Sequence, residues 1–156
     1  MTQTKTALYR DLLLQAQGLV TGIDDPIANA ANIAALIWYG LPDLNWAGFY
    51  FAKDRELVLG PFQGKPACVR IADGKGVCGA AAAARQTLIV PDVHAFEGHI
   101  ACDSASNAEI VVPLIRNGAV IGVLDLDSPL RARFDEADAA GLEAIAAVWI
   151  AASKAF

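Results

Sequence analysis

The chain has 156 residues, of which 55% are hydrophobic, enough for one well-buried core within the usual size of a single domain. Its net charge of -5 excludes the dense basic patches with which proteins bind nucleic acid or anionic membrane surfaces. Because no apolar run approaches the roughly 20 residues of a membrane span and the N-terminus lacks a signal-peptide pattern, we expect a single cytoplasmic domain over residues 1–156.

Three segments carry apolar side chains at the i, i+3, i+4 spacing of amphipathic helices. These predicted helices cover about residues 3–21, 25–40 and 135–153. Asp24 or Asp25 followed by Pro26 is typical of a helix start, and acidic residues mark the first turn of the last helix.

The central part of the chain, about 45–128, is rich in turn signals and in apolar segments of strand length. Asn117-Gly118 between two such segments is a strong hairpin signal, whereas the prolines and glycines of 60–66 predict irregular structure. An alanine-rich stretch from Val77 predicts one short helix. The order of elements predicts an α+β domain, with a central antiparallel sheet, helices mainly on one face and a loop-covered ligand pocket on the other.

The polar stretch from His94 to Glu109 differs from the apolar, periodic remainder of the chain. It contains both histidines and Cys102, and it leads directly into a strand, which is typical of a functional loop. A cysteine nucleophile needs exposure and a field that favours the thiolate; His99 could supply such a field, and Asp103 would oppose it. We therefore predict that Cys102 is a nucleophile.

Cys68 and Cys78 lie at junctions between predicted elements, where a second thiol could approach Cys102 closely enough for a disulfide. Cys68 is the better candidate, because Cys78 at the start of an alanine-rich helix also suits simple burial. Zinc is the competing use of these cysteines and the histidines. Only His99 and Cys102 have the short ligand spacing of structural zinc sites, so we predict no metal.

Asp125 and Asp127 end the last predicted strand, and strict alternation places them on one face with Ile121 and Val123. There they could hold a ligand ammonium, or one carboxyl group could stay protonated beside the other and act as an acid. A solvated strand end is the alternative.

Trp46 and Tyr50 in the aromatic segment could wall the pocket, although such strands are more often simple core. Glu109 presents a conflict. A regular two-residue turn at Asn117-Gly118 places it opposite Leu126, on the other face of the sheet from Asp125. Joint action of Glu109 and Asp125 then requires a bulge or an irregular strand.

The chain from about residue 45 onward contains three motifs that carry cysteines or acids. They are Gly60-Pro61-Phe62-Gln63-Gly64-Lys65-Pro66-Ala67-Cys68, His99-Ile100-Ala101-Cys102-Asp103-Ser104-Ala105-Ser106-Asn107 and Gly122-Val123-Leu124-Asp125-Leu126-Asp127-Ser128. Together with Gly76-Val77-Cys78-Gly79 they resemble the free methionine-(R)-sulfoxide reductases, which are built on a GAF domain.

The resemblance implies a GAF-like fold and the reduction of free methionine-(R)-sulfoxide to methionine. Cys102 would attack the sulfoxide and become a sulfenic acid, Cys68 would condense with it to a disulfide, and Cys78 would be a second relay. Thioredoxin would restore the thiols, with no bound cofactor. The resemblance also implies that Glu109, Asp125 and Asp127 bind the substrate ammonium and help to protonate the departing oxygen, that Trp46 packs against the S-methyl group, and that the chain forms a homodimer.

A GAF-type regulatory domain that binds a small molecule without catalysis is the alternative function. Such a sensor normally signals to an attached domain, and 156 residues leave no room for one beside the predicted fold.

Overall fold

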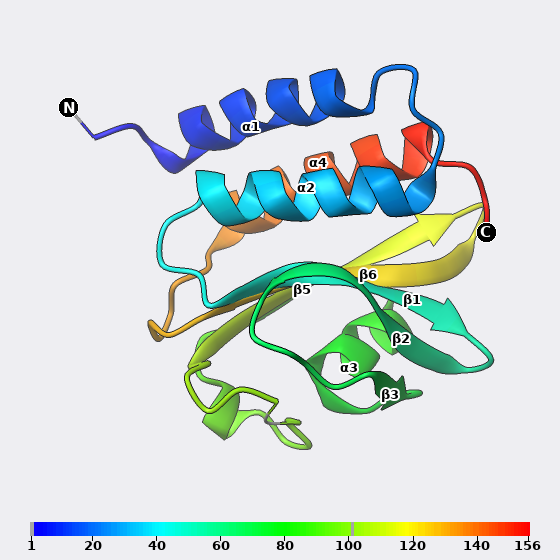
Figure 1. Ribbon diagram of the computed structural model, residues 1–156. Helices are drawn as coiled ribbons and strands as arrows, with labels where there is room; N and C mark the ends of the chain where they lie inside the picture. The colour runs from blue at the N-terminus through cyan, green and yellow to red at the C-terminus, as the bar shows by residue number, and fades with distance from the viewer. Residues whose placement is uncertain (1, 101) are drawn as a thin grey trace.

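The computed structural model describes residues 2–100 and 102–156, so that Ala101 of the expected nucleophile loop lies outside the described residues. The chain folds around one six-stranded antiparallel sheet with the strand order β3-β2-β1-β6-β5-β4 (Figure 1). The elements are α1 (Lys5–Val20), α2 (Pro26–Gly40), β1 (Trp46–Lys53), β2 (Glu56–Gly64), β3 (Arg70–Ala72), α3 (Gly76–Ala84), β4 (Leu88–Val90), the 3-10 helix η1 (Val93–Ala95), β5 (Ala108–Arg116), β6 (Ala119–Ser128) and α4 (Glu136–Ala152).

Helices cover the two faces of the sheet unequally. α2 and α4 pack on one face, and α1 packs on those two helices as an outer layer (Figure 1). The other face carries α3 together with β3 and the loops around it. The predicted α+β architecture, with helices mainly on one face and loops over the other, is confirmed.

The helix starts follow from local side-chain chemistry. Asp25 accepts hydrogen bonds from the backbone N–H groups of Ile27 and Ala28, and Pro26 occupies the first turn of α2, where its missing N–H is not needed. Asp135 caps α4 in the same way and forms a capping box with Asp138.

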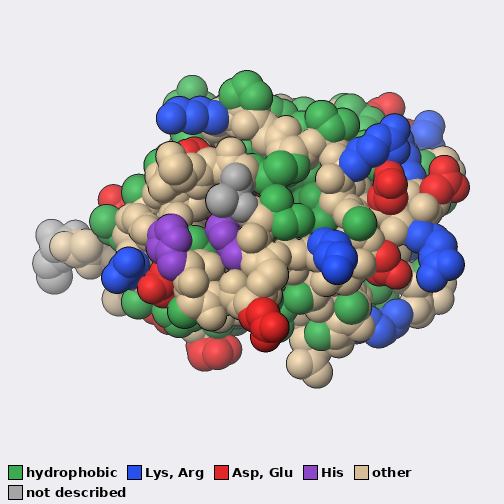
Figure 2. Space-filling model, turned by 90° about the horizontal axis from the view of Figure 1, so that it is seen from below, with side chains coloured by type: hydrophobic (Ala, Val, Ile, Leu, Met, Phe, Trp, Pro, Cys, Tyr) green, Lys and Arg blue, Asp and Glu red, His purple; other side chains and the backbone are tan. Residues whose placement is uncertain are grey.

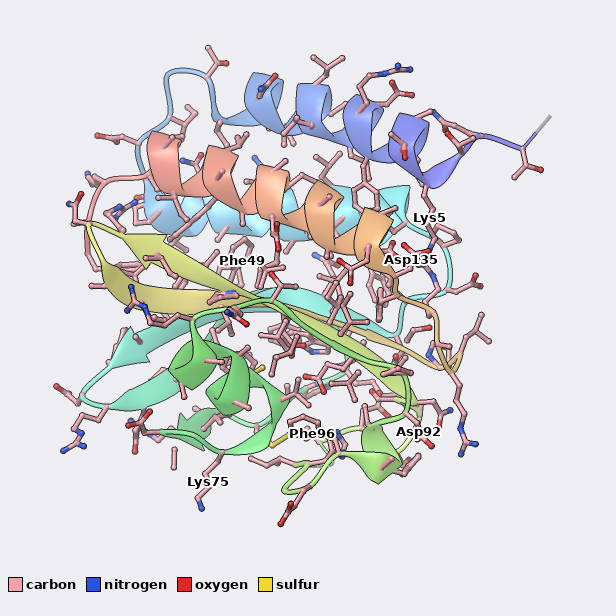
Figure 3. The ribbon with its side chains drawn as sticks, turned by 180° about the vertical axis from the view of Figure 1, so that it is seen from behind. Lys5, Phe49, Lys75, Asp92, Phe96 and Asp135 are labelled. Carbon is pink, nitrogen blue, oxygen red and sulfur yellow. A yellow bond between two sulfur atoms is a disulfide. The ribbon has the colours of Figure 1, made fainter. Side chains whose placement is uncertain are left out.

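Alternation along the central strands divides the apolar side chains into two clusters. Phe49, Ile110 and Leu124 point toward α2 and α4, as Phe49 shows in Figure 3. Tyr50 and Val111 point the other way, toward α3 and the loops. Each central strand is therefore buried on both faces, and a polar side chain on the loop side lies inside the molecule.

The expectation that residues 60–66 are irregular is wrong for residues 60–64, because β2 continues to Gly64, and holds for Lys65 and Pro66. Gly48 pairs with Phe62 and Tyr50 pairs with Leu59, so two residues of β2, Gly60 and Pro61, lie opposite Phe49 alone. Pro61 thus falls in a β-bulge, where the ladder is interrupted and a missing N–H does little harm.

No helix within residues 2–100 and 102–156 combines the length and the apolar character that crossing a membrane requires.

Candidate active site

Three acidic side chains meet on the loop side of the sheet. Glu109 comes from β5, and Asp125 and Asp127 come from β6. Glu109 pairs directly with Asp127, and Asp125 pairs with Val111, two residues further along β5. Glu109 and Asp125 are buried and Asp127 is half-buried, so the carboxyl groups form the floor of an enclosed site.

The prediction that Glu109 and Asp125 lie on opposite faces is wrong. The hairpin begins as expected, but one residue of β6, Ile121, has no partner in β5. The flanking pairs are Arg116 with Ala119, Ile115 with Val120, and Leu114 with Gly122. This bulge shifts the register by one residue and so brings Glu109 to the face of Asp125. Ile121 itself packs with the apolar cluster that faces α2 and α4, whereas Val123 belongs to the cluster on the side of α3, so the two do not share a face.

A pocket opens above these acids. Its empty volume is about 560 Å³ including the solvent at its mouth, which suits a small ligand. The predicted residues Trp46, Tyr50, Glu109, Asp125, Asp127 and Cys102 all line it. Further lining residues come from the two loops that carry Cys68 and Cys102, namely Lys65, Pro66, Ala67, His99, Ile100, Asp103 and Ser106. The sheet therefore supplies the floor and the loops supply the rim.

Burial controls the charge of the acidic floor. It raises the pKa of Glu109 and of Asp127 well above the usual carboxyl range, and the neighbouring Asp125 adds to both shifts by repulsion. Burial also raises the pKa of Asp125, to about 6, although hydrogen bonding from Glu109 and Cys78 opposes this rise. The floor therefore combines two carboxyl groups whose protonated forms are favoured by burial with a third, Asp125, that can ionise.

Two aromatic side chains of β1 join the floor to the rim. Tyr50 donates its hydroxyl hydrogen to the carbonyl oxygen of Cys68 at 2.8 Å, and the Trp46 indole N–H donates to the carbonyl oxygen of Lys65 at 3.2 Å. The two rings stack with their centroids 5.8 Å apart. The loop that carries Cys68 is thus held over the pocket by residues that also form its wall.

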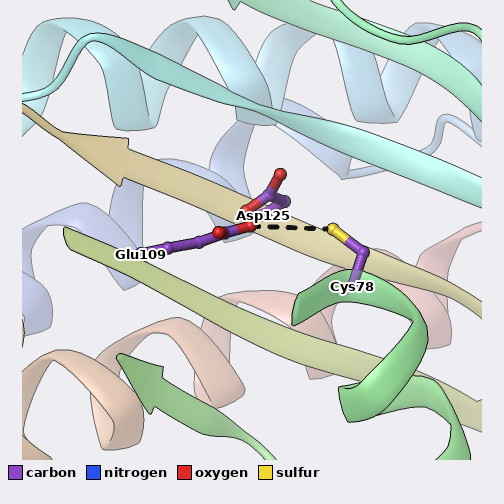
Figure 4. Close-up of side chains that lie close together, drawn as sticks. All are labelled: Cys78, Glu109 and Asp125. Atoms are coloured by element: carbon purple, nitrogen blue, oxygen red, sulfur yellow. Dashed lines mark hydrogen bonds between the residues drawn. The ribbon is translucent and has the colours of Figure 1, made fainter. Parts of the chain in front are cut away.

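The three cysteines have different environments. Cys68 and Cys102 form a disulfide with their Cα atoms 5.9 Å apart, although 34 residues separate them in the sequence. Cys78 is a free thiol, buried in the first turn of α3, and its Sγ lies 3.9 Å from Oε1 of Glu109 (Figure 4). Burial, with repulsion from Asp125 and Glu109, raises the pKa of the Cys78 thiol.

The chain is similar to known proteins over most of its length. The GAF-domain family matches residues 15–151. The free methionine-R-sulfoxide reductase of Escherichia coli is 52% identical over 92% of this chain and 87% of its own length, and that of Saccharomyces cerevisiae is 46% identical over 91% and 83%. The X-ray structure of the Neisseria meningitidis free methionine-R-sulfoxide reductase in complex with its substrate superposes with a TM-score of 0.94, at 46% identity over 97% of this chain and 92% of that one.

The chain belongs to the GAF-domain family of free methionine-R-sulfoxide reductases.

In this member of the reductase family, the sequence interpretation missed the residues that hold the Cys102 loop. Asn45, just before β1, donates from its side-chain nitrogen to Asp103 at 3.1 Å and to the hydroxyl of Ser106 at 2.9 Å. The backbone N–H of Ala105, with the help of Asn45, lowers the pKa of Asp103, which therefore stays ionised. The role of Asn45 could not be predicted from its neighbours in the sequence, because its partners lie about sixty residues away.

The sequence suggests only one role for His99, to supply a field that favours the thiolate of Cys102. In the reductase pocket its Nε2 lies 3.8 Å from Oε2 of Glu109, and partial burial together with His94 lowers its pKa. A neutral imidazole of this kind interacts with the acidic floor and gives little stabilisation to a thiolate.

Cys78, Glu109 and Asp125 offer three ligand atoms within 4.8 Å of one another, a spacing that could hold a cation. To bind a cation, the Cys78 thiol and Glu109 would both have to lose a proton, although burial favours their protonated forms. That this reductase works without a metal remains a prediction.

Proposed function

We propose that this protein reduces free methionine-(R)-sulfoxide to methionine with Cys102 as the nucleophile. The observation that carries the proposal is the Cys68–Cys102 disulfide at the rim of a pocket with an acidic floor. This bridge is the product expected when a first thiol has reduced a sulfoxide and a second has condensed with it. The named activity of the relatives and the substrate complex of the Neisseria enzyme support the same substrate.

The reaction balances over three steps. The Cys102 sulfur attacks the sulfoxide sulfur, the oxygen and a proton pass to Cys102, and methionine leaves with a sulfenic acid in its place. The Cys68 thiol then displaces water from the sulfenic acid and forms the disulfide. A dithiol reductant finally supplies two electrons and two protons, which restore both thiols and leave the reductant as a disulfide.

The acidic floor can serve both ends of the substrate. Burial raises the pKa of Glu109 and of Asp127 and so favours their protonated forms, from which either group can donate a proton to the sulfoxide oxygen as it leaves sulfur. Asp125, with a pKa of about 6, can ionise, and its buried Oδ1 accepts no hydrogen bond from the described residues. This oxygen is suited to the substrate ammonium, and a methionine sulfoxide within a peptide has no such group.

The pocket walls fit the remainder of the substrate. Trp46 lines the pocket with its indole ring stacked against Phe62, 5.2 Å between the ring centroids, and can contact the S-methyl group. Cys78 remains a candidate second relay. Because its thiol is buried and its pKa is raised, it would react more slowly than the exposed Cys102.

Thioredoxin is the reductant we propose, since the chemistry needs a dithiol and no bound cofactor. A reducing compartment such as the cytoplasm would suit this cycle. A homodimer remains an expectation from the family resemblance. Light scattering on the protein as it elutes from a size-exclusion column would test it.

The test is NADPH oxidation coupled through thioredoxin reductase and thioredoxin, with the separate R and S epimers of free methionine sulfoxide. We expect turnover of the R epimer, little turnover of the S epimer and loss of activity in Cys102→Ser. Turnover of neither epimer would favour a regulatory GAF domain without catalysis. Full activity in Cys102→Ser would remove Cys102 from the mechanism.

A further inference from the structure

The surface around the disulfide exposes two large apolar side chains. Val69, which follows Cys68, is 60% exposed, and Ile100, two residues before Cys102, is 39% exposed. Most other exposed large hydrophobic side chains of the described residues belong to α1, α2 or the turn between them, on the opposite side of the sheet. Figure 2 shows the loop face, where hydrophobic side chains gather beside the two histidines.

The structure supports the backbone of Val69 and one side of Ile100. The carbonyl oxygen of Val69 accepts a hydrogen bond from the N–H of Leu59 in β2 at 2.9 Å, so its backbone continues the sheet edge. Ile100 lies against the start of α3, where a Cβ on Gly76 would come within 3.3 Å of its Cδ1. Exposed apolar side chains that are supported in this way cost less entropy when a partner covers them.

The disulfide joins residues adjacent in sequence to Val69 and close to Ile100, and it is accessible. Cys102 is exposed and Cys68 is half-buried. A reducing thiolate must reach one sulfur of the bridge directly, and a protein reductant must cover the surrounding surface while it does so. Exposed hydrophobic patches beside such a group are typical of protein contact sites.

We propose that Val69 and Ile100 form the docking surface for a thioredoxin-type dithiol protein, which contacts them while it reduces the Cys68–Cys102 bridge. This inference rests on the proposed function for its biological purpose. One thiolate of the partner attacks a sulfur of the bridge, the other bridge sulfur leaves as a thiolate, and the partner's second thiol resolves the mixed disulfide. The partner ends as the disulfide, and this chain ends with two thiols.

The test measures the rate at which reduced thioredoxin, or dithiothreitol, reduces the preformed bridge, followed by thiol trapping and mass spectrometry. Val69→Asp should lower the second-order rate constant for thioredoxin about tenfold and leave that for dithiothreitol unchanged, because only the protein needs the apolar contact. Val69→Asn should give a smaller loss of the same kind.

Ile27→Asp is the matched control. Ile27 is 48% exposed, lies in the first turn of α2 on the opposite side of the sheet, and tolerates an acid there. An unchanged thioredoxin rate in Val69→Asp, an equal loss with both reductants, or the same loss in Ile27→Asp would overturn the proposal. The assay contains no sulfoxide, so failure of the proposed substrate would not affect it.

Discussion

At the scale of single residues, the site depends on carboxyl groups that the fold keeps away from water. Asp125 is the informative case, since it is buried beside Glu109 and its pKa is raised to about 6. An acid whose pKa is higher in the folded than in the unfolded chain favours folding below the unfolded value. That stabilisation is lost as pH rises through the folded value.

Asp125→Asn should therefore flatten the pH dependence of stability. The share of Asp125 in this dependence should be a fall of up to roughly 3 kcal/mol in the free energy of unfolding between pH 4 and pH 8, because a rise of about two pKa units has that worth. The variant should lack this share and keep the fall that comes from the raised pKa values of Glu109 and Asp127. Urea unfolding at a series of pH values measures it, with Asp54→Asn in the exposed β1–β2 turn as control. If the free energy of unfolding depends on pH in the same way in the wild type and in Asp125→Asn, the raised pKa of Asp125 is contradicted.

At the scale of elements, α4 is joined to α1 through its first turn. Lys5 contacts Asp135 at 2.9 Å and Asp138 at 2.6 Å, and the Tyr9 hydroxyl donates to Asp138 at 2.8 Å (Figure 3 labels Lys5 and Asp135). Asp135 is also the N-cap of α4. The hydrogen bond from Lys5 lowers the pKa of Asp135 to about 2.

Asp135→Ala should lower the free energy of unfolding by about 1 kcal/mol at pH 7, the usual effect of removing a helix cap. Because the pKa of Asp135 is depressed on folding, its contribution is present above about pH 4 and disappears as pH falls toward 2. Unfolding at pH 7 and pH 2.5 tests this, with Glu136→Ala as the matched first-turn control. If Asp135→Ala lowers the free energy of unfolding by the same amount at both pH values, the ionised carboxylate of Asp135 is not what stabilises the helix start.

The elements also show what the sequence could predict. The start of α2 at Asp25 and Pro26 and the hairpin at Asn117-Gly118 were predictable, because each depends on a few adjacent residues. The bulge at Pro61 was not predictable, because alternation gives no warning of one extra residue. For the second hairpin the sequence indicated that a bulge or an irregular strand would be needed to bring Glu109 and Asp125 together, but not that it lies at Ile121.

The consequence of the Ile121 bulge is large for the site. The acids, Cys102 and Cys68 were identified from the sequence by their chemistry and by family resemblance. Their common face came only from the register. Asn45 and the contact of Cys78 with Glu109 depend on distant parts of the chain, and local patterns cannot reveal such contacts.

At the scale of the whole molecule, the disulfide joins two loops that lie on the same side of the sheet. It closes a segment of 34 residues that contains β3, α3 and β4. A cross-link over a loop of that length restricts the unfolded chain and should stabilise the fold by about 4 kcal/mol on the chain-entropy account.

The oxidised protein should therefore unfold at higher urea concentration than the reduced protein. Cys68→Ser should unfold at the same concentration with or without reductant, because it cannot form the bridge. If the oxidised and the reduced wild type unfold at the same urea concentration, the expected stabilisation by the disulfide is contradicted. Comparison of the slopes of the two transitions would show whether the unfolded states differ in compactness.

The most direct test of the central claim is a single turnover without external reductant. Fully reduced protein is mixed with excess free methionine-(R)-sulfoxide, methionine is counted, and the cysteines are mapped by mass spectrometry. We predict one methionine per chain, a Cys68–Cys102 bridge and a free Cys78. Absence of methionine, or a bridge between Cys78 and Cys102 with Cys68 free, would contradict the account.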